Sequence, residues 1–285
     1  MGLHYSILTP NGLYDKPMLL REYILQSHDD LGTTAGEAAE IVNALPEAIQ
    51  RAPCFRLRLT GAWCYEYGLP FDLPNGQVLF GAPQVPPVKK LVAAVHAVLR
   101  YTRETTRTAI LRRLENRQKH DQVLAELAPP ALARNLRSAD HEVPGCESRT
   151  IDWHLRWENG MQLLLEVKSR IYDVVETLPK ADPAHPTTLV PLTAPERLFK
   201  DVEGKFPLRS PSECLQAAWV EVPVKQNKRA IDEHFARMDP ARVHLGIIWP
   251  GDIADRRAYL LCRDGIDGPA VLRLFGLGHS EGLVF

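Results

Sequence analysis

The sequence predicts an α/β protein, with a mixed β-sheet flanked by helices and an α+β region before it. Two observations lead to this fold class. Apolar residues recur at helical spacing in several segments, and short runs in the middle of the chain alternate apolar with polar residues. The chain has 285 residues, enough for one large domain or two small ones. We expect an accessory α+β region over residues 1–88 and a larger domain over residues 89–285.

The composition excludes several classes of protein. Hydrophobic residues make up 45% of the chain and charged residues 24%, as in ordinary globular proteins. No apolar run approaches the roughly 18 residues of a membrane span, and the N-terminus does not resemble a secretory signal. The cysteines are scattered without CxxC spacing, which argues against a disulfide framework or zinc cluster and favours a reducing cytoplasm. They are Cys54, Cys64, Cys146, Cys214 and Cys262.

The first region, residues 1–88, combines two helical patterns with a strand. Apolar residues recur at helical spacing over 19–24 and 38–45, and residues 33–37 form a plausible helix cap between them. Residues 55–60 alternate apolar with polar side chains, which is typical of a half-buried strand.

A single long helix is predicted from Val88 to about His120, because its apolar residues form one stripe with two threonines in the middle. The rest of this segment is strongly basic. Such a surface is either a solvated helix face or a site that binds the phosphates of nucleic acid, and the sequence leaves both open. The candidate phosphate-binding residues are Arg100, Arg103, Arg107, Arg112, Arg113 and Arg117.

Beyond this helix, Pro129-Pro130 restarts the chain and residues 131–136 form a short predicted helix. Residues 177–212 contain seven prolines and little periodicity, so we expect a long surface loop inserted in the domain. The remaining expected elements are a strand at 217–224, a helix at 226–238, and strands at 243–249, 258–262 and 271–275.

The most informative segment is a predicted hairpin over residues 150–170, with Asn159-Gly160 at its turn. A two-residue loop would mix apolar with acidic residues on both faces. A three-residue loop with Gly160 in a left-handed bulge separates them. The expected pairs are Trp157 with Met161, Leu155 with Leu163, Trp153 with Leu165, and Ile151 with Val167. The same register sets Asp152 opposite Glu166, with Lys168 two residues further on.

Two facing carboxylates repel each other, so they are most stable when a divalent cation lies between them. Oxygen ligands of this kind suit Mg²⁺ or Mn²⁺. Such a metal lowers the pKa of a bound water and polarises a phosphoryl oxygen, while a neighbouring ammonium orients the water or stabilises developing charge. This combination is suited to hydrolysis of a phosphodiester.

Asp152, a gap of 13 residues, and then Glu166-Val167-Lys168 at the end of an apolar strand resemble the PD-(D/E)XK nuclease superfamily. The resemblance covers roughly residues 115–250. It implies a restriction-endonuclease-like core, a divalent metal, and cleavage of DNA or sometimes RNA. It also implies that Asp152 and Glu166 bind metal, that Lys168 is the catalytic lysine, and that Glu126 is a candidate third acid from the preceding helix.

Two features depart from the family's pattern. Ile151 stands where the family has proline, and the proline-rich segment separates the motif from the next helix by an unusual length. At the start of that helix, Lys225 and Lys228 are further candidate phosphate contacts.

We therefore expect an Mg²⁺-dependent nuclease, with DNA favoured over RNA as substrate and no membrane partner. Glu203-Gly204-Lys205 has the same Glu-x-Lys spacing but lies in the proline-rich segment without an alternating strand, so we assign it no role. Three alternatives stay open: a surface ion-pair cluster, a binding protein that keeps the nuclease-like fold, and a scaffold protein. The sequence also leaves the oligomeric state open, with a homodimer as one option.

Overall fold

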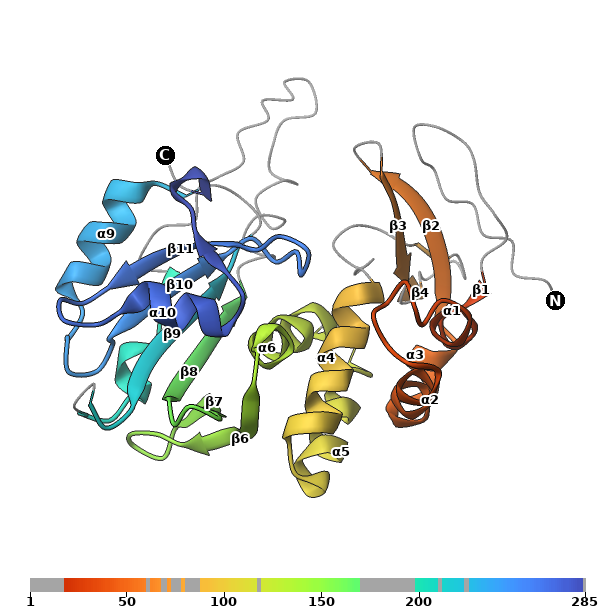
Figure 1. Cartoon of the computed structure of the whole chain (residues 1–285), viewed down its shortest axis with the longest axis horizontal. Coiled ribbons are helices and arrows are strands. Elements are labelled where there is room, and N and C mark those ends of the chain that lie inside the picture. The colour runs from red at the N-terminus through yellow and green to blue at the C-terminus, as the bar shows by residue number, and fades with distance from the viewer. Residues whose placement is uncertain are drawn as a thin grey trace. The chain divides into compact units, whose positions relative to one another are not determined.

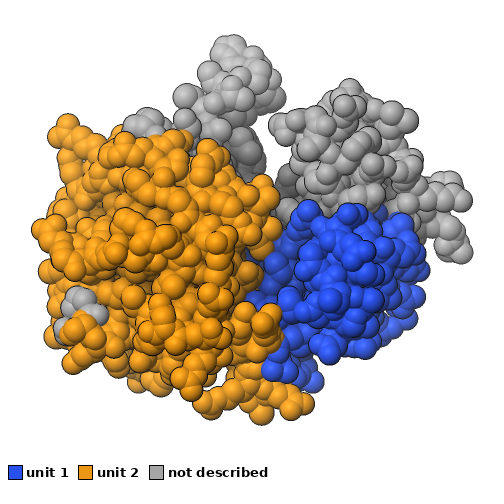
Figure 2. Space-filling model, viewed as in Figure 1, with its two compact units in different colours: residues 1–99, 107–124 blue, residues 100–106, 125–285 orange. Residues whose placement is uncertain are grey.

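The computed structural model describes nine ranges of the chain: residues 18–59, 62–67, 71–72, 78–79, 88–116, 119–169, 198–209, 212–222 and 226–283. Two predicted phosphate contacts, Arg117 and Lys225, lie outside these ranges. The chain divides into two compact units, coloured separately in Figure 2. The first consists of residues 1–99 and 107–124, so it extends past the predicted boundary at residue 88. The second consists of residues 100–106 and 125–285.

The first unit has the predicted α+β content. Its helices and strands are β1 (Met18–Leu19), α1 (Leu20–Gln26), α2 (Ala35–Ala44), α3 (Glu47–Gln50), β2 (Pro53–Leu59), β3 (Ala62–Tyr67), β4 (Phe71–Asp72) and β5 (Val78–Leu79). The strands β1, β2 and β3 pair antiparallel in that order. The predicted cap is confirmed, because Glu37 N–H donates to Thr34 Oγ1 at 3.2 Å and Thr34 N–H donates to the Glu37 carboxylate at 2.8 Å.

The prediction of one long helix from Val88 to about His120 is wrong. The segment forms two helices, α4 (Val88–Tyr101) and α5 (Glu104–Arg113), with a break at Thr102 and Arg103. Thr102 is buried, with 4% of its surface exposed. A threonine loses side-chain freedom inside a helix, and its hydroxyl competes for backbone partners, so the break falls at a position of low helix propensity.

The second unit is built on a seven-stranded mixed sheet with the strand order β12-β11-β10-β9-β8-β7-β6 (Figure 1). The strands are β6 (Leu136–Pro144), β7 (Thr150–Trp157), β8 (Gln162–Ser169), β9 (Leu215–Glu221), β10 (Leu245–Trp249), β11 (Arg257–Cys262) and β12 (Gly278–His279). β6, β7 and β8 form an antiparallel meander, whereas β8, β9 and β10 run parallel. Every residue of β9 and β10 is buried, so the core lies around these central strands.

Helices flank this sheet on both faces. The helices that follow the meander are α9 (Lys228–Arg237) and α10 (Gly268–Leu274), and α6 (His120–Leu132) precedes it. Ile231 and Phe235 of α9 belong to the same buried cluster as Leu164 and Val220. Phe275, directly after α10, contacts Trp219 on the other face, with ring centroids 5.2 Å apart. The predicted mixed sheet flanked by helices is therefore confirmed.

Two smaller predictions are wrong. Residues 131–136 are not a separate helix, because α6 continues through Pro129 and Pro130 to Leu132 and a strand begins at Leu136. The segment 271–275 is mostly helical rather than a strand. Its helix begins where Asp267 accepts the Ala270 N–H at 2.9 Å, a cap that outweighs the ambiguous apolar run.

The prediction that all of residues 177–212 form a surface loop is also wrong, because its second half enters the core. Four apolar side chains there are buried, with at most 3% exposed: Leu198, Phe199, Val202 and Phe206. A short 3-10 helix, η2 (Glu203–Lys205), lies among them. Every helix within the described ranges is too short or too polar to cross a lipid bilayer.

Candidate active site

The hairpin of β7 and β8 has the predicted register from Trp153 to the turn, but the ladder does not extend to the predicted pairs of Ile151 with Val167 and Asp152 with Glu166. Trp153 pairs with Leu165 and Leu155 pairs with Leu163. The loop has three residues, since Trp157 N–H donates to Met161 O at 3.0 Å. Gly160 has a φ of 85°, in the left-handed region expected of the bulge position. The alternation of apolar residues was therefore enough to fix the pairing.

The ladder between β7 and β8 ends just before Asp152. Its last pair is Trp153 with Leu165. Beyond that pair, Ile151 keeps its partner on β6 and Val167 keeps its partner on β9, but the two residues do not pair with each other. At this point Val167 N–H donates to Asp152 Oδ2 at 2.7 Å. A side-chain carboxylate accepts the bond where a backbone carbonyl of the neighbouring strand would otherwise serve. Asp152 is thus fixed between the two strands.

The pKa of Asp152 is raised from 3.8 to about 7. Burial is the largest cause, and the nearby carboxylates of Glu166 and Glu126 contribute to the same shift. The Val167 N–H and the ammonium of Lys205 act in the opposite direction. Glu166 and Glu126 therefore both act electrostatically on Asp152. Near neutral pH, Asp152 takes up a proton readily because burial, and then the two neighbouring carboxylates, disfavour its ionised form.

Glu166 is the most deeply buried acid of the group, with 1% of its surface exposed. Its Oε1 accepts from two ammonium groups, Lys168 Nζ at 2.9 Å and Lys205 Nζ at 2.5 Å. Its Oε2 is buried and has no hydrogen-bond partner among the described residues. The predicted triad of Asp152, Glu166 and Lys168 is thus brought together, with one carboxylate oxygen left to accept a ligand.

Lys205 is the residue of this cluster that sequence reasoning missed. It belongs to η2, in the Glu203-Gly204-Lys205 sequence to which we assigned no role. The turn is held between the fully buried Val202 and Phe206, and Lys205 O accepts the Cys146 N–H at 2.9 Å. A usable signal was the spacing of apolar residues at 198, 199, 202 and 206, which resembles a helix face and was masked by the prolines around it.

Glu126 is held near Asp152 by a defect in α6. Pro130 has no N–H, so the Glu126 carbonyl four residues earlier lacks its helical donor. Trp153 Nε1 donates to that carbonyl instead, at 2.7 Å. The Glu126 carboxylate pairs with His141 Nε2, and the His141 ring packs edge-on against Trp153. The Trp153 indole on β7 therefore holds α6, which carries Glu126, next to the strand that carries Asp152.

These contacts fit a divalent cation in part. Asp152 and Glu166 supply hard oxygen ligands, and the free Glu166 Oε2 is available to one. The described residues contain no group of three His, Cys, Asp or Glu side chains close enough to hold a metal by themselves. Any such ion would be held by two carboxylates, with water or substrate completing its coordination, as Mg²⁺ commonly is.

No family model, curated protein or solved structure matches this chain.

The candidate phosphate-binding residues are less clearly grouped. Arg100 and Arg103 belong to the second unit, whereas Arg107, Arg112 and Arg113 belong to the first. Arg100, Arg103 and Arg112 are exposed. Lys228 is already engaged, since its Nζ lies 2.9 Å from Glu281 Oε1.

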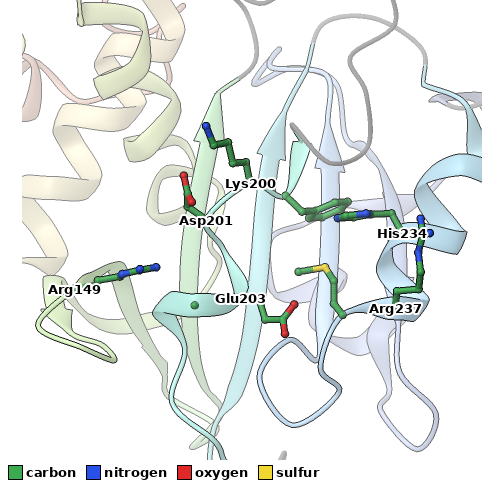
Figure 3. A pocket seen from close by; sticks show the side chains of 9 residues that line it. Arg149, Lys200, Asp201, Glu203, His234 and Arg237 are labelled. Carbon is green, nitrogen blue, oxygen red and sulfur yellow. The ribbon is translucent and has the colours of Figure 1, made fainter.

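A hollow of about 510 Å³ adjoins the turn that carries Lys205 (Figure 3). Glu203 and Gly204 of η2 form part of its wall, and Arg149 and Arg237 come from a loop and from α9. The lining as a whole is of mixed charge: Arg149, Phe199, Lys200, Asp201, Glu203, Gly204, His234, Arg237 and Met238. One side of η2 therefore faces this hollow, while Lys205 contacts Glu166.

Proposed function

We propose that this protein is a metal-dependent nuclease that hydrolyses phosphodiester bonds in DNA, with Mg²⁺ or Mn²⁺ as its cofactor. The observation that carries the proposal is the buried cluster at the end of the β7–β8 ladder. The Glu166 carboxylate acts electrostatically on Asp152 there, and Lys168 contacts Glu166 at 2.9 Å. The resemblance of these residues to the PD-(D/E)XK motif supports the same reaction.

Asp152 and Glu166 would hold the metal, because these two acids otherwise repel each other. When bound, such an ion supplies an activated water and stabilises negative charge on the phosphoryl group. The high pKa of Asp152 has a direct consequence for this role. The carboxylate must lose its proton before it can serve as a ligand, so the site is best prepared at pH values above about 7.

Lys168 supplies the positive charge on the substrate side of the proposed reaction. Its ammonium is partly exposed, with 18% of the side chain accessible, and it is oriented by Glu166. An ammonium in this place can orient a water molecule or stabilise the charge that develops on a phosphoryl oxygen. Removal of Lys168 should therefore slow cleavage far more than it weakens DNA binding.

DNA is the favoured substrate, and the exposed arginines Arg100 and Arg103 of the second unit are proposed to contribute contacts to its phosphates. These contacts are independent of base sequence, so they imply no site specificity.

The proposal is tested by incubating supercoiled plasmid with the protein and Mg²⁺ or Mn²⁺, at pH 8. We expect nicking or linearisation that EDTA abolishes. Asp152→Asn and Lys168→Met should each reduce the rate at least about a hundredfold while circular dichroism stays unchanged. Lys200→Met, an exposed lysine, serves as the matched control and should cleave at the wild-type rate. Equal cleavage by Lys168→Met and wild type would rule out the proposed site.

The alternative is a non-catalytic protein that binds nucleic acid or a partner through a nuclease-like fold. One observation favours it: two lysines already neutralise Glu166. Such a protein would bind DNA with a steep salt dependence, and both Asp152→Asn and Lys168→Met would bind like wild type. It would show no metal-dependent cleavage of plasmid at any pH.

A further inference from the structure

We propose that Lys205 is a positioning residue of this site, an internal cation that holds Glu166 until a divalent metal replaces it. This inference rests on the function proposed above. It goes further in assigning a role to a residue outside the motif, on an element 39 positions from Glu166 in the sequence.

The charges around Glu166 point to this role. A buried carboxylate needs a compensating positive charge, and Lys168 on the same strand already supplies one at 2.9 Å. Lys205 adds a second at 2.5 Å on the same oxygen, and its charge also acts on Asp152. An ammonium that contacts one acid and acts electrostatically on the other does part of what a cation between them would do. A metal at Asp152 and Glu166 would repel it, so the two compete.

The local structure lets the ammonium leave without disturbing the fold. The backbone of η2 is fixed by the buried Val202 and Phe206, and by the bond from Cys146 N–H to Lys205 O. The lysine side chain is long, has many rotamers, and is 21% exposed. Its neighbours Glu203 and Gly204 line the hollow in Figure 3 rather than packing in the core. A change of side-chain rotamer is therefore sufficient to move the Lys205 ammonium away from Glu166.

Metal affinity separates this role from a purely structural one. Calorimetric titration with Mn²⁺ should give a dissociation constant about tenfold lower for Lys205→Met than for wild type, because the competing positive charge is gone. Lys205→Arg should restore an affinity near that of wild type. Lys200→Met, in the same segment but lining the hollow, should leave the affinity unchanged. Equal or weaker Mn²⁺ binding by a folded Lys205→Met variant would overturn the inference.

A second measurement uses the wild-type protein, in case Lys205→Met does not fold. Reductive methylation followed by peptide mass spectrometry reports how accessible each lysine is. Saturating Mn²⁺ should increase labelling of Lys205 at least twofold relative to Lys200, and unchanged labelling would contradict displacement. A wild-type protein that binds no Mn²⁺ overturns the proposed function and this inference together. One that binds Mn²⁺ as tightly as Lys205→Met overturns only the role of Lys205.

Discussion

Asp152→Asn should stabilise the metal-free protein while it removes metal binding. The carboxylate of Asp152 is partly buried beside two other acids, and its pKa is raised from 3.8 to about 7. The neutral amide has a similar shape, and its oxygen can still accept the Val167 N–H that Asp152 Oδ2 accepts at 2.7 Å. The substitution therefore removes an unfavourable charge and keeps the hydrogen bond that fixes the strand end.

The magnitude follows from the shift in pKa. Native Asp152 retains a proton between about pH 4 and pH 7 that the unfolded chain has released, so its contribution to stability falls as pH rises through that window. A shift of about three pH units corresponds to at most about 4 kcal/mol above pH 7. Because the carboxylates are coupled and partly balanced by lysines, we expect a gain of about 2 to 4 kcal/mol at pH 8. At pH 4 the gain should be close to zero.

Urea denaturation in EDTA, at pH 4, 6 and 8, measures this difference directly. Asp140→Asn on the neighbouring strand is the matched control, because Asp140 accepts from Arg156 Nη1 at 2.5 Å and its loss should not stabilise the protein. Adding Mn²⁺ at pH 8 should raise the midpoint of wild type and leave that of Asp152→Asn unchanged. If Asp152→Asn is less stable than wild type at pH 8, or if the difference between them does not grow with pH, the electrostatic reasoning is wrong.

Three further predictions concern the same region. Mn²⁺ binding at pH 6 should release about one proton from Asp152, which calorimetry in two buffers with different ionisation enthalpies would detect as a buffer-dependent heat. Trp153→Phe should cost about 1 to 3 kcal/mol, because it removes the indole N–H that donates to the Glu126 carbonyl. The cost should shrink in a Pro130→Ala background that restores the helical N–H, and a double-mutant cycle without coupling would contradict this. Gly145→Ala should destabilise the protein by about 1 to 3 kcal/mol in urea, since the new Cβ would lie 2.6 Å from the backbone oxygen of the η2 turn, and a neutral effect would show that the turn yields easily.

The parts of the fold that follow from local pattern were predictable. Alternation of apolar residues on two strands, with Gly160 at the turn, was sufficient for the register of the hairpin. The Thr34 capping box was likewise predictable, because all the groups involved lie within four residues. In both cases the determining contacts are close in sequence, so a single chain contains the whole pattern.

The parts that depend on distant contacts were not predictable in the same way. Lys205 contacts Glu166 across the proline-rich segment, and neither the residue types nor their spacing predicts this contact. The position of Glu126 depends on the indole of Trp153 replacing a donor that Pro130 lacks. In the sequence, Pro129 and Pro130 suggested that a new helix begins after them. In the structure, the same prolines lie inside the last turns of α6.

The contact between Asp152 and Val167 has a consequence for how the hairpin is built. A pair of strands usually ends where its residues stop favouring extension, but here one polar side chain ends it. Replacing Asp152 with valine would remove the side-chain acceptor of the Val167 N–H, and the two strands could then continue to pair past residue 152. The residue proposed to bind metal therefore also sets the length of the hairpin. The Asp152→Val variant would therefore lose the proposed activity and form a longer, more regular hairpin, so both effects would arise from one substitution.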